Sequence, residues 1–425
     1  MINKKVSLAV IGAGGRGLRA YGQYVQEHHR DAQIVAVAEP RDFYRSETAK
    51  LHNIPEKNIF TSWEHLLSCP KLADAVIIST PDRLHKDPAI AAAEKGYHIL
   101  LEKPMSPTAK DCIEIVEAAK KNNVILAVCH VMRYTPFYKK VKEIIDSGKL
   151  GEIACIQHLE GVAWWHYVHS YVRGEWRNTQ ESSFMLLAKS CHDIDMIRWY
   201  LDGKRCLRVA SFGHLKHFRK EHKPAQAASR CMNCPLADDD CPYSAKKFYF
   251  GRLRGGNTGW PLPKVIHEFT EDALEKALRE GPWGRCVYEC DNDVVDHQVV
   301  SMEFEDKITA DFTMTTFTPY GRRIRLMGTK GYLEGDEQII KVLDFVTEKW
   351  FKYEVNKSPL DITGGHGGGD QGLMEAFIEA IRHEDTEDIK TGPDETLESH
   401  LIVFAAERAR LEGRVVSLDE MYKYV

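Results

Sequence analysis

Residues 6–17 read Val-Ser-Leu-Ala-Val-Ile-Gly-Ala-Gly-Gly-Arg-Gly, an apolar, β-branched run followed directly by a glycine-rich turn. Gly12, Gly14 and Gly17 satisfy the pattern G-x-G-x-x-G between a strand and a helix. The first glycine permits the tight turn, the second lets the backbone approach a pyrophosphate, and the third lets helix and strand pack closely. The stretch therefore predicts a βα unit whose helix N-terminus can bind phosphate.

An acidic residue follows the next predicted strand at the distance that this motif requires. Residues 34–38 form an apolar run, and Glu39 lies about twenty residues beyond the last glycine. A carboxylate there would accept hydrogen bonds from both ribose hydroxyls of a dinucleotide. Its charge would repel the 2′-phosphate of NADP, so we expect NAD. Arg41 keeps NADP as the second possibility, because its guanidinium could pair with that phosphate.

The residues expected to contact the dinucleotide in this region are Gly12, Ala13, Gly14, Gly15, Arg16, Gly17, Glu39 and Arg41. They belong to the opening third of the chain, where short β-branched runs alternate with helical segments. The predicted strands are 6–11, 34–38, 75–79, 98–101 and 124–128. This alternation is typical of a doubly wound parallel sheet, and it predicts an α/β fold with an N-terminal Rossmann domain over residues 1–130.

The remainder, residues 131–425, has another pattern. Ile308, Ala310, Phe312 and Met314 alternate with polar residues, as expected for a half-buried strand, and residues 323–334 form a predicted hairpin. We expect an α+β domain with a large, mainly antiparallel open sheet that serves substrate binding and oligomerisation. Its open face favours a homodimer or homotetramer. A cysteine-rich insertion is expected at about 213–290.

Composition and net charge restrict the kinds of molecule that the protein is expected to bind. The chain has 425 residues and a formal net charge of −5, which provides no long-range attraction for nucleic acid or acidic membranes. No stretch approaches the ~18 apolar residues needed to span a bilayer. We therefore expect a cytoplasmic protein that acts on small molecules.

Polar residues follow two further predicted strands, where ligands bind in open α/β sheets. Thr80, Pro81, Asp82 and His85 come after the third clear strand, and Glu102-Lys103-Pro104 comes after the next. Combined with the glycine turn, these motifs resemble the Gfo/Idh/MocA family of NAD(P)-dependent sugar and cyclitol dehydrogenases, over nearly the whole chain. The resemblance implies cofactor contacts at these residues, with Lys103 catalytic beside the nicotinamide.

A second family element reads Asp-x-Gly-x-His-x-x-Asp, with the first aspartate and the histidine around the substrate hydroxyl. Here the residues are Ala188-Lys189-Ser190-Cys191-His192-Asp193-Ile194-Asp195. His192 and Asp195 match the pattern, whereas Ala188 replaces the first aspartate. The resemblance implies that His192 assists at the substrate oxygen, and Lys189 is a candidate cation beside the vacated position.

Further polar and aromatic side chains are candidates for a sugar site, because aromatic faces stack on sugar rings. These candidate substrate residues are His130, Arg133, Trp164, Trp165 and His366, together with His192. His366 lies in a glycine-rich loop that resembles one near the active site of a glycosidase branch of the family.

Five of the eleven cysteines fall into two groups within the insertion. Cys231, Cys234 and Cys241 have spacings typical of zinc ligands, and Cys286 or Cys290 could complete four thiolates. We expect a structural zinc site, with Cys286 as its fourth ligand, that holds an insertion lacking its own core. An iron–sulfur cluster and free thiols are the alternatives.

Three functional hypotheses follow. The first is an NAD-dependent dehydrogenase that transfers hydride from a secondary hydroxyl of a sugar or cyclitol to the nicotinamide. The second is an NAD-dependent glycosidase that passes through a transient keto-sugar by oxidation, elimination and reduction. The third is a catalytically inactive NAD-binding regulator, for which the missing aspartate at position 188 is the main support.

Overall fold

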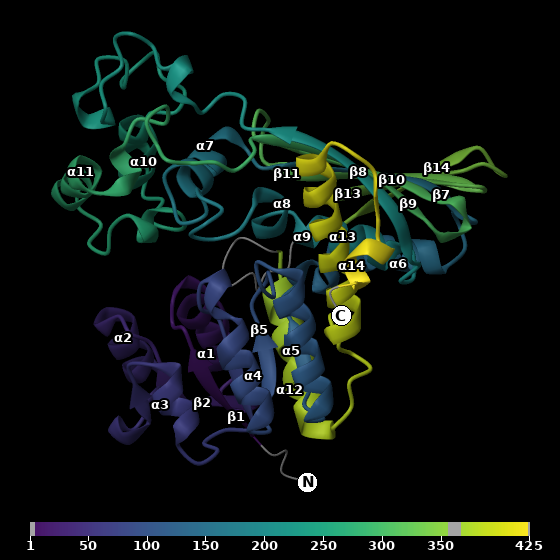
Figure 1. The fold of residues 1–425 in the computed structure, drawn as a ribbon, viewed down its shortest axis with the longest axis horizontal. Coiled ribbons are helices and arrows are strands. Elements are labelled where there is room, and N and C mark those ends of the chain that lie inside the picture. Colours follow the sequence, from purple (N-terminus) through teal and green to yellow (C-terminus); the bar gives the residue numbers. More distant parts are fainter. Residues whose placement is uncertain (1–4, 356–366, 424–425) are drawn as a thin grey trace.

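The computed structural model describes residues 5–355 and 367–423, which form two sheets with helices between and around them (Figure 1). The first sheet is parallel and six-stranded, in the order β3-β2-β1-β4-β5-β6. Its strands are β1 (Val6–Ile11), β2 (Ala32–Ala38), β3 (Ile59–Phe60), β4 (Ala75–Ile78), β5 (His98–Leu101) and β6 (Leu126–Val128). The doubly wound α/β prediction is confirmed. The two-residue strand β3 was not predicted, because two residues show no periodicity.

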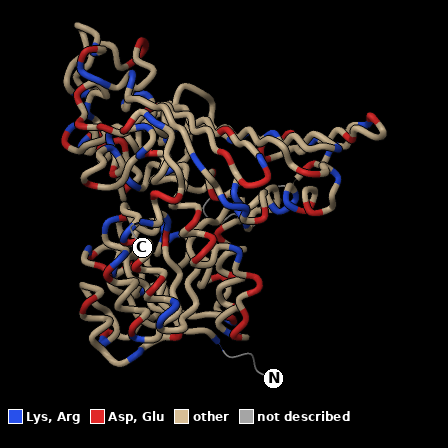
Figure 2. The backbone as a smooth tube through the Cα atoms, turned by 45° about the vertical axis from the view of Figure 1, so that its right-hand side comes forward, with Lys and Arg blue, Asp and Glu red and all other residues tan. Residues whose placement is uncertain are grey.

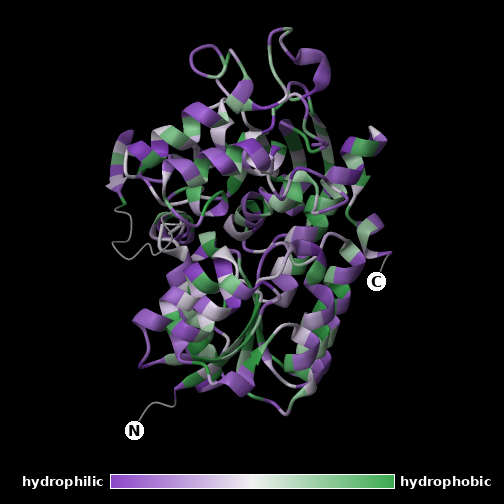
Figure 3. Cartoon of the chain, turned by 90° about the vertical axis from the view of Figure 1, so that its left-hand side faces the viewer, coloured by the Kyte–Doolittle hydropathy of each residue, from purple (hydrophilic) through white to green (hydrophobic). Residues whose placement is uncertain are grey.

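Helices cover both faces of this sheet, which explains its continuous apolar strands. They are η1 (Gly15–Gly22), α1 (Gln23–Glu27), α2 (Asp42–His52), α3 (Trp63–Ser68), α4 (Lys86–Glu94) and α5 (Ala109–Lys121). Figure 3 shows apolar strands in the middle of this domain and polar residues on the outer sides of its helices. The chain runs outward from β1 in both directions, so the gap between β1 and β4 is the topological switch point where open α/β sheets bind ligands.

The second sheet has nine strands in the order β14-β13-β12-β11-β7-β10-β9-β8-β15. Its strands are β7 (Ile153–Gly161), β8 (Cys206–His214), β9 (His297–Phe304), β10 (Thr309–Thr315), β11 (Gly321–Gly328), β12 (Gly331–Gly335), β13 (Ile339–Asp344), β14 (Lys349–Glu354) and β15 (Val416–Ser417). Strands β7 and β10 pair in parallel, and the other pairs are antiparallel. This confirms the mainly antiparallel α+β prediction.

One face of the nine-stranded sheet packs on helices, and these helices connect it to the first sheet (Figure 1). The helices of this layer are α6 (Pro136–Asp146), α8 (Met185–Ala188), α9 (Cys191–Tyr200) and α13 (Pro393–Glu412). Ala310, Phe312 and Met314 are buried against this layer, as their alternation predicted. Helix α12 (Gly369–His383) returns to the first sheet, where Phe377 and Ile378 pack in the core with β1.

The remaining helical segments are short turns. They are η2 (Glu56–Asn58), η3 (Asp82–Leu84), η4 (Val131–Tyr134), α7 (Trp164–Tyr167), η5 (Val168–Val172), η6 (Lys220–His222), η7 (Cys231–Asn233), η8 (Leu262–Lys264), η9 (Pro282–Gly284), η10 (Glu305–Lys307) and α14 (Asp419–Tyr422). Among the described residues, no helix is both long and apolar enough to cross a membrane. Figure 2 shows acidic and basic residues interspersed over both domains.

The insertion between β8 and β9 has a hydrophobic core of its own, contrary to the expectation from sequence. Helices α10 (Ala245–Arg254) and α11 (Glu271–Glu280) pack their apolar sides together. The side chains buried there include those of Tyr249, Phe250, Leu262, Ile266, Leu274 and Leu278. Leu274 and Leu278 lie one turn apart on α11, and their partners in this core lie too far away in sequence to be assigned by pattern.

The predicted metal site is not supported. Cys231, Cys234, Cys241 and Cys286 are all free thiols. Cys241 lies near Cys231 and Cys234. Burial is the main cause that raises the pKa of Cys241, and these two thiols raise it further. However, no three His, Cys, Asp or Glu side chains in residues 5–355 and 367–423 are grouped closely enough to hold a metal ion. A packed apolar core takes the stabilising role that sequence spacing had assigned to zinc or an iron–sulfur cluster.

We predict that Leu274→Ala destabilises the insertion by about 2–5 kcal/mol, because it leaves a cavity in this small core. Limited proteolysis with increasing urea should show earlier cleavage between β8 and β9. Leu411→Ala is the matched control, because Leu411 is 69% exposed on α13. Equal resistance of the Leu274→Ala insertion and the wild-type insertion would contradict the core assignment.

Candidate active site between the two sheets

The glycine turn is shaped by close backbone contacts at the end of β1. Gly12 has a φ of +88°, and a Cβ there would lie 2.8 Å from the backbone of Ser79. A Cβ on Gly17 would lie 2.2 Å from the carbonyl oxygen of Gly12, whereas Gly15 has no atom within 4 Å of its Cβ position. The turn therefore needs glycine at positions 12 and 17 and presents open space at Gly15. These features fit a dinucleotide phosphate, which needs a close backbone approach at a helix N-terminus.

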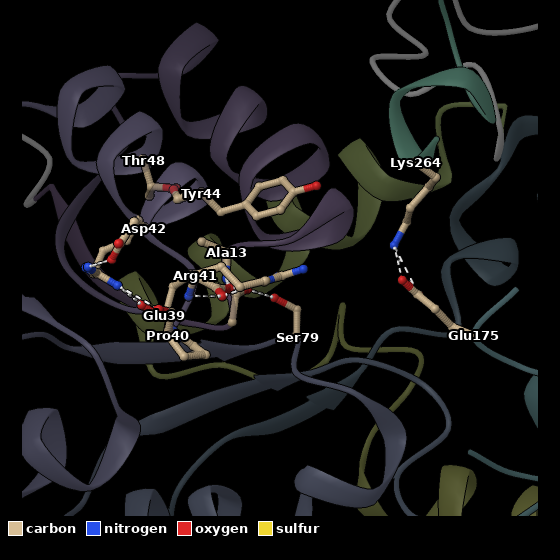
Figure 4. Close-up of polar contacts among 12 residues, drawn as sticks. Ala13, Glu39, Pro40, Arg41, Asp42, Tyr44, Thr48, Ser79, Glu175 and Lys264 are labelled. Atoms are coloured by element: carbon tan, nitrogen blue, oxygen red, sulfur yellow. Dashed lines mark hydrogen bonds and ion pairs between the residues drawn. The ribbon is translucent and has the colours of Figure 1, made fainter. Parts of the chain in front are cut away.

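Glu39 lies beside this turn with its carboxylate buried (Figure 4). The backbone N–H of Ala13 donates to Glu39 Oε2 at 2.8 Å, and Arg41 donates from Nε and Nη2 at 2.7 and 2.9 Å. Burial alone would raise the pKa of Glu39, but the hydrogen bonds from Arg41 and Ala13 outweigh it and lower the pKa. The carboxylate is therefore ionised, as recognition of ribose hydroxyls requires.

Arg41 is engaged by Glu39 and by an aromatic ring. Its guanidinium carbon lies 4.3 Å from the centre of the Tyr44 ring. The hydrogen bond to Glu39 is the main cause that raises the pKa of Arg41. A 2′-phosphate would have to take this guanidinium from a bidentate carboxylate partner.

Arg16 and Glu102 belong to a partly buried ion network that sequence reasoning found only in part. Arg16 forms ion pairs with both Glu102 and Asp370, and Tyr21 donates to Glu102. Burial alone would raise the pKa of Glu102, but the Arg16 charge and the Tyr21 hydrogen bond lower it. The network ties η1, the end of β5 and the start of α12 together. Asp370 was missed because nothing in its own sequence neighbourhood points to Arg16.

The turn after β4 is anchored rather than open. His85 contacts the carbonyl oxygens of Pro104 and Thr80, each at 2.8 Å from a ring nitrogen. Asp82 accepts hydrogen bonds from the hydroxyls of Ser182 and Ser183 at 3.2 and 2.8 Å. These contacts fix the turn against Lys103-Pro104 on one side and against the second domain on the other.

Lys103 reaches from the end of β5 to the second domain. Its Nζ donates to the carbonyl oxygen of Ala188 at 2.8 Å. Ala188 is the last residue of α8, where carbonyl groups lack partners within the helix. The lysine therefore bonds to the backbone of the residue that replaces the aspartate of the family motif.

His192 lies at the start of α9 within a group of buried histidines. Its ring centre is 5.3 Å from that of His130, which lies 5.4 Å from that of His400. Burial is the main cause that lowers the pKa of His130 to about 4 and that of His400 to about 3. Both rings are thus neutral at physiological pH. His130 is fully buried next to His192, and its predicted contact with a sugar stays a prediction.

Arg133 belongs to a buried ion pair. Its Nε and Nη2 each donate to Asp195 at 2.7 Å, and its Nη1 donates to the carbonyl oxygen of Lys390 at 2.6 Å. Both Arg133 and Asp195 are buried. This guanidinium therefore holds α9 to the segment before α13, and its predicted contact with a substrate stays a prediction.

Lys189 belongs to a second buried ion network. Its Nζ lies 3.1 Å from Glu160, and Arg322 contacts both Glu160 and Asp193 at 2.7 and 2.6 Å. His158 is 2.9 Å from the same Asp193. Burial alone would lower the pKa of Lys189, but the Glu160 charge raises it above its usual value. Lys189 is therefore a held cation and is unsuited to accept a proton.

Aromatic rings gather beside these charges. Trp165 lies 5.7 Å from His166 and 5.7 Å from Trp260, and the ring of Tyr320 lies 6.0 Å from His166. Lys189 Nζ is 5.7 Å from the centre of the Tyr320 ring. Sequence reasoning named Trp165 but missed Trp260, which comes from the insertion.

Trp164 is 42% exposed at the start of α7, so its face is available to a ligand. His366, the remaining substrate candidate, lies outside the described residues. Together, the junction between the domains brings a primary amine, an imidazole and exposed aromatic surface near the carboxyl ends of β4 and β5. These groups can bind a hydroxylated ring and exchange a proton with one of its hydroxyls.

The comparisons with known proteins agree with this architecture. Residues 6–130 match a model for an oxidoreductase family with an NAD-binding Rossmann fold. Residues 142–418 match the model for the C-terminal alpha/beta domain of the same family. Among solved structures, levoglucosan dehydrogenase in complex with NADH and levoglucosan has a TM-score of 0.69 and 18% identity, covering 98% of this chain and 100% of that one. At that identity the likeness shows the fold alone.

Curated relatives include YteT of Bacillus subtilis, which is 23% identical over 387 residues, covering 85% of this chain and 86% of its own. The 2,7-anhydro-N-acetylneuraminate hydratase of Escherichia coli is 31% identical over 214 residues, covering 49% of this chain and 53% of its own. Inositol 2-dehydrogenase of Corynebacterium glutamicum is 28% identical over 210 residues, covering 49% and 57%. With both domain models matched over most of its length, the chain belongs to the Gfo/Idh/MocA oxidoreductase family.

Proposed function

We propose that this protein is an NAD-dependent oxidoreductase that takes hydride from a secondary hydroxyl of a sugar or cyclitol. The observation that carries the proposal is the reach of Lys103 from β5 to Ala188 at the start of the His192 segment. This contact supports a reacting hydroxyl held between the lysine and the histidine. NAD bound at the glycine turn and Glu39 would supply the hydride acceptor.

In this proposal, side chains of the protein accept the proton and orient the substrate. Lys103 takes the hydroxyl proton as the carbon is oxidised, and His192 hydrogen-bonds the same oxygen. Lys189 stays charged beside Glu160 and interacts with polar groups of the ring. Trp164 and Trp165 offer apolar faces to the C–H side of the sugar.

We prefer NAD to NADP because Glu39 is buried, ionised and already paired with Arg41. A 2′-phosphate would face this carboxylate and would need Arg41 to leave it.

A glycosidase that oxidises its substrate only transiently is the second candidate. Ala188 favours it over a standard inositol-type mechanism, because the aspartate of the family motif is absent. The relative named a 2,7-anhydro-N-acetylneuraminate hydratase lends further support to redox-neutral chemistry. An inactive NAD-binding regulator is the third candidate.

We predict that Lys103→Met lowers turnover by at least about a hundredfold, because it removes the proton acceptor, while NAD binding stays close to wild type. The assay is a panel of sugars, cyclitols and aryl glycosides with NAD, followed for both NADH and released aglycone. NADH formation identifies a dehydrogenase, and aglycone release without NADH identifies the glycosidase.

Lys110→Met is the control for this variant, because Lys110 is a surface lysine with 73% of its side chain exposed. Unchanged turnover in Lys103→Met would contradict the proposed mechanism. Absence of any product across the panel, with NAD still bound, would favour the regulator.

We also propose that the protein forms homo-oligomers through the outer face of the nine-stranded sheet. Phe212 pairs in register with Val299, Val299 with Thr313, and Thr313 with Leu159, so these residues follow one row across the sheet. Phe212 is 66% exposed and Val299 is 42% exposed. Exposed apolar side chains on adjacent strands of a wide sheet, such as Phe212 and Val299, are typical of a subunit interface.

We predict that Val299→Glu shifts the protein toward a single chain in sedimentation velocity, because it places a charge in the middle of this row. Leu411→Glu is the control, since Leu411 is exposed on α13 and outside the sheet. Identical sedimentation of Val299→Glu and wild type at several concentrations would argue against this interface.

A further inference from the structure

The segment 260–267 of the insertion contacts both the aromatic group near Lys189 and the nucleotide-binding domain. Its first residue, Trp260, lies 4.7 Å from His166 and 5.5 Å from His169, measured between ring centres. His166 is close to Lys189, because its ring centre lies 6.0 Å from that of Tyr320, which is 5.7 Å from Lys189 Nζ. One end of the segment therefore borders the proposed substrate site.

The other end lies on α2, beside the residues that face the adenosine ribose. The ring of His267 stacks on Phe43 with centres 4.6 Å apart and an interplanar angle of 25°, and it meets the edge of Tyr44 at 5.9 Å. The ring of Tyr44 in turn lies against the guanidinium of Arg41, which forms an ion pair with Glu39. This end of the segment thus reaches the adenosine half of the cofactor site.

Between these ends, Lys264 Nζ lies 3.1 Å from both carboxylate oxygens of Glu175. Figure 4 shows Lys264 and Glu175 pointing toward each other on the side of the view toward which Arg41 and Tyr44 extend. Glu175 is near enough to add, after the larger effect of Glu39, to the raised pKa of Arg41. The middle of the segment is therefore held on the second domain while facing the cofactor site.

The segment is also anchored from behind. Leu262 is fully buried and Ile266 is 6% exposed, both within the small core that α10 and α11 form. Inward side chains thus alternate with Trp260, Lys264 and His267, which contact the rest of the protein. The segment therefore connects the insertion to the first domain and makes contacts at both of its ends.

We propose that segment 260–267 is a clasp that retains the dinucleotide through repeated turnovers, by closing the path between the insertion and α2. The inference rests on the proposed function, because it requires NAD at the glycine turn and Glu39. Of the candidates named above, a clasp favours the second, a redox-neutral enzyme for glycosides or anhydro-sugars, since a retained cofactor does not leave as NADH after each turnover.

The test measures NAD exchange, without any substrate. Protein loaded with radiolabelled NAD is chased with excess unlabelled NAD, and association is followed separately. A clasp limits both entry and exit, so His267→Ala should raise both rate constants by about three- to tenfold, the range expected for one aromatic contact. Phe43→Ala should give the same effect, and the double variant should add little, because both remove one contact.

Phe269→Ala is the matched control, because Phe269 lies two residues further along, is 42% exposed and makes no ring contact within the described residues. A faster exit with unchanged entry in His267→Ala would overturn the clasp, since it would indicate a direct contact with NAD. Unchanged rates in His267→Ala, with NAD bound, would also overturn the clasp but leave the proposed function intact. Failure of the wild-type protein to bind NAD would overturn the proposed function itself.

Discussion

The close approach of η1 to the end of β1 is the constraint on which the candidate site depends. Only glycine at position 17 lets the helix lie against the Gly12 carbonyl, because a Cβ would come within 2.2 Å of that oxygen. With the helix in this place, Arg16 points back to the end of β5 and pairs with Glu102. The residue after Glu102 is Lys103. The close packing at Gly17 therefore affects the direction in which the Lys103 amine points.

Buried ion pairs also fix the positions of helices at the domain junction. Arg16 also meets Asp370 of α12, and Arg133 holds Asp195 of α9. Burying such charges is favourable only where each has a partner with good geometry, and losing one partner would leave the other uncompensated. The ion pairs therefore make the relative placement of Lys103 and His192 sensitive to residues that touch neither a cofactor nor a substrate.

Local sequence patterns predicted most strands of the fold, together with candidate residues at the nucleotide turn and after β5. The glycine turn, Glu39 and Lys103 were found because each lies at a strand end, and the strands have strong apolar periodicity. Arg133 and His130 were predicted to contact the substrate because polar residues at a domain crossing resemble a binding surface. Their contacts with Asp195 and His400 could not be predicted, because these partners are distant in sequence. The cysteine spacing suggested a metal site, whereas the insertion's stability comes from leucine and aromatic packing between helices.

The replacement of aspartate by alanine at position 188 changes the electrostatics of the site. A carboxylate there would give the Lys103 ammonium a full countercharge, but the structure gives it a backbone carbonyl, which stabilises a cation less strongly. The neighbouring positive charge of Lys189 is matched by Glu160. The substitution therefore removes one charge from the site but leaves in place Lys103 and His192, the two groups that the proposed proton transfer uses.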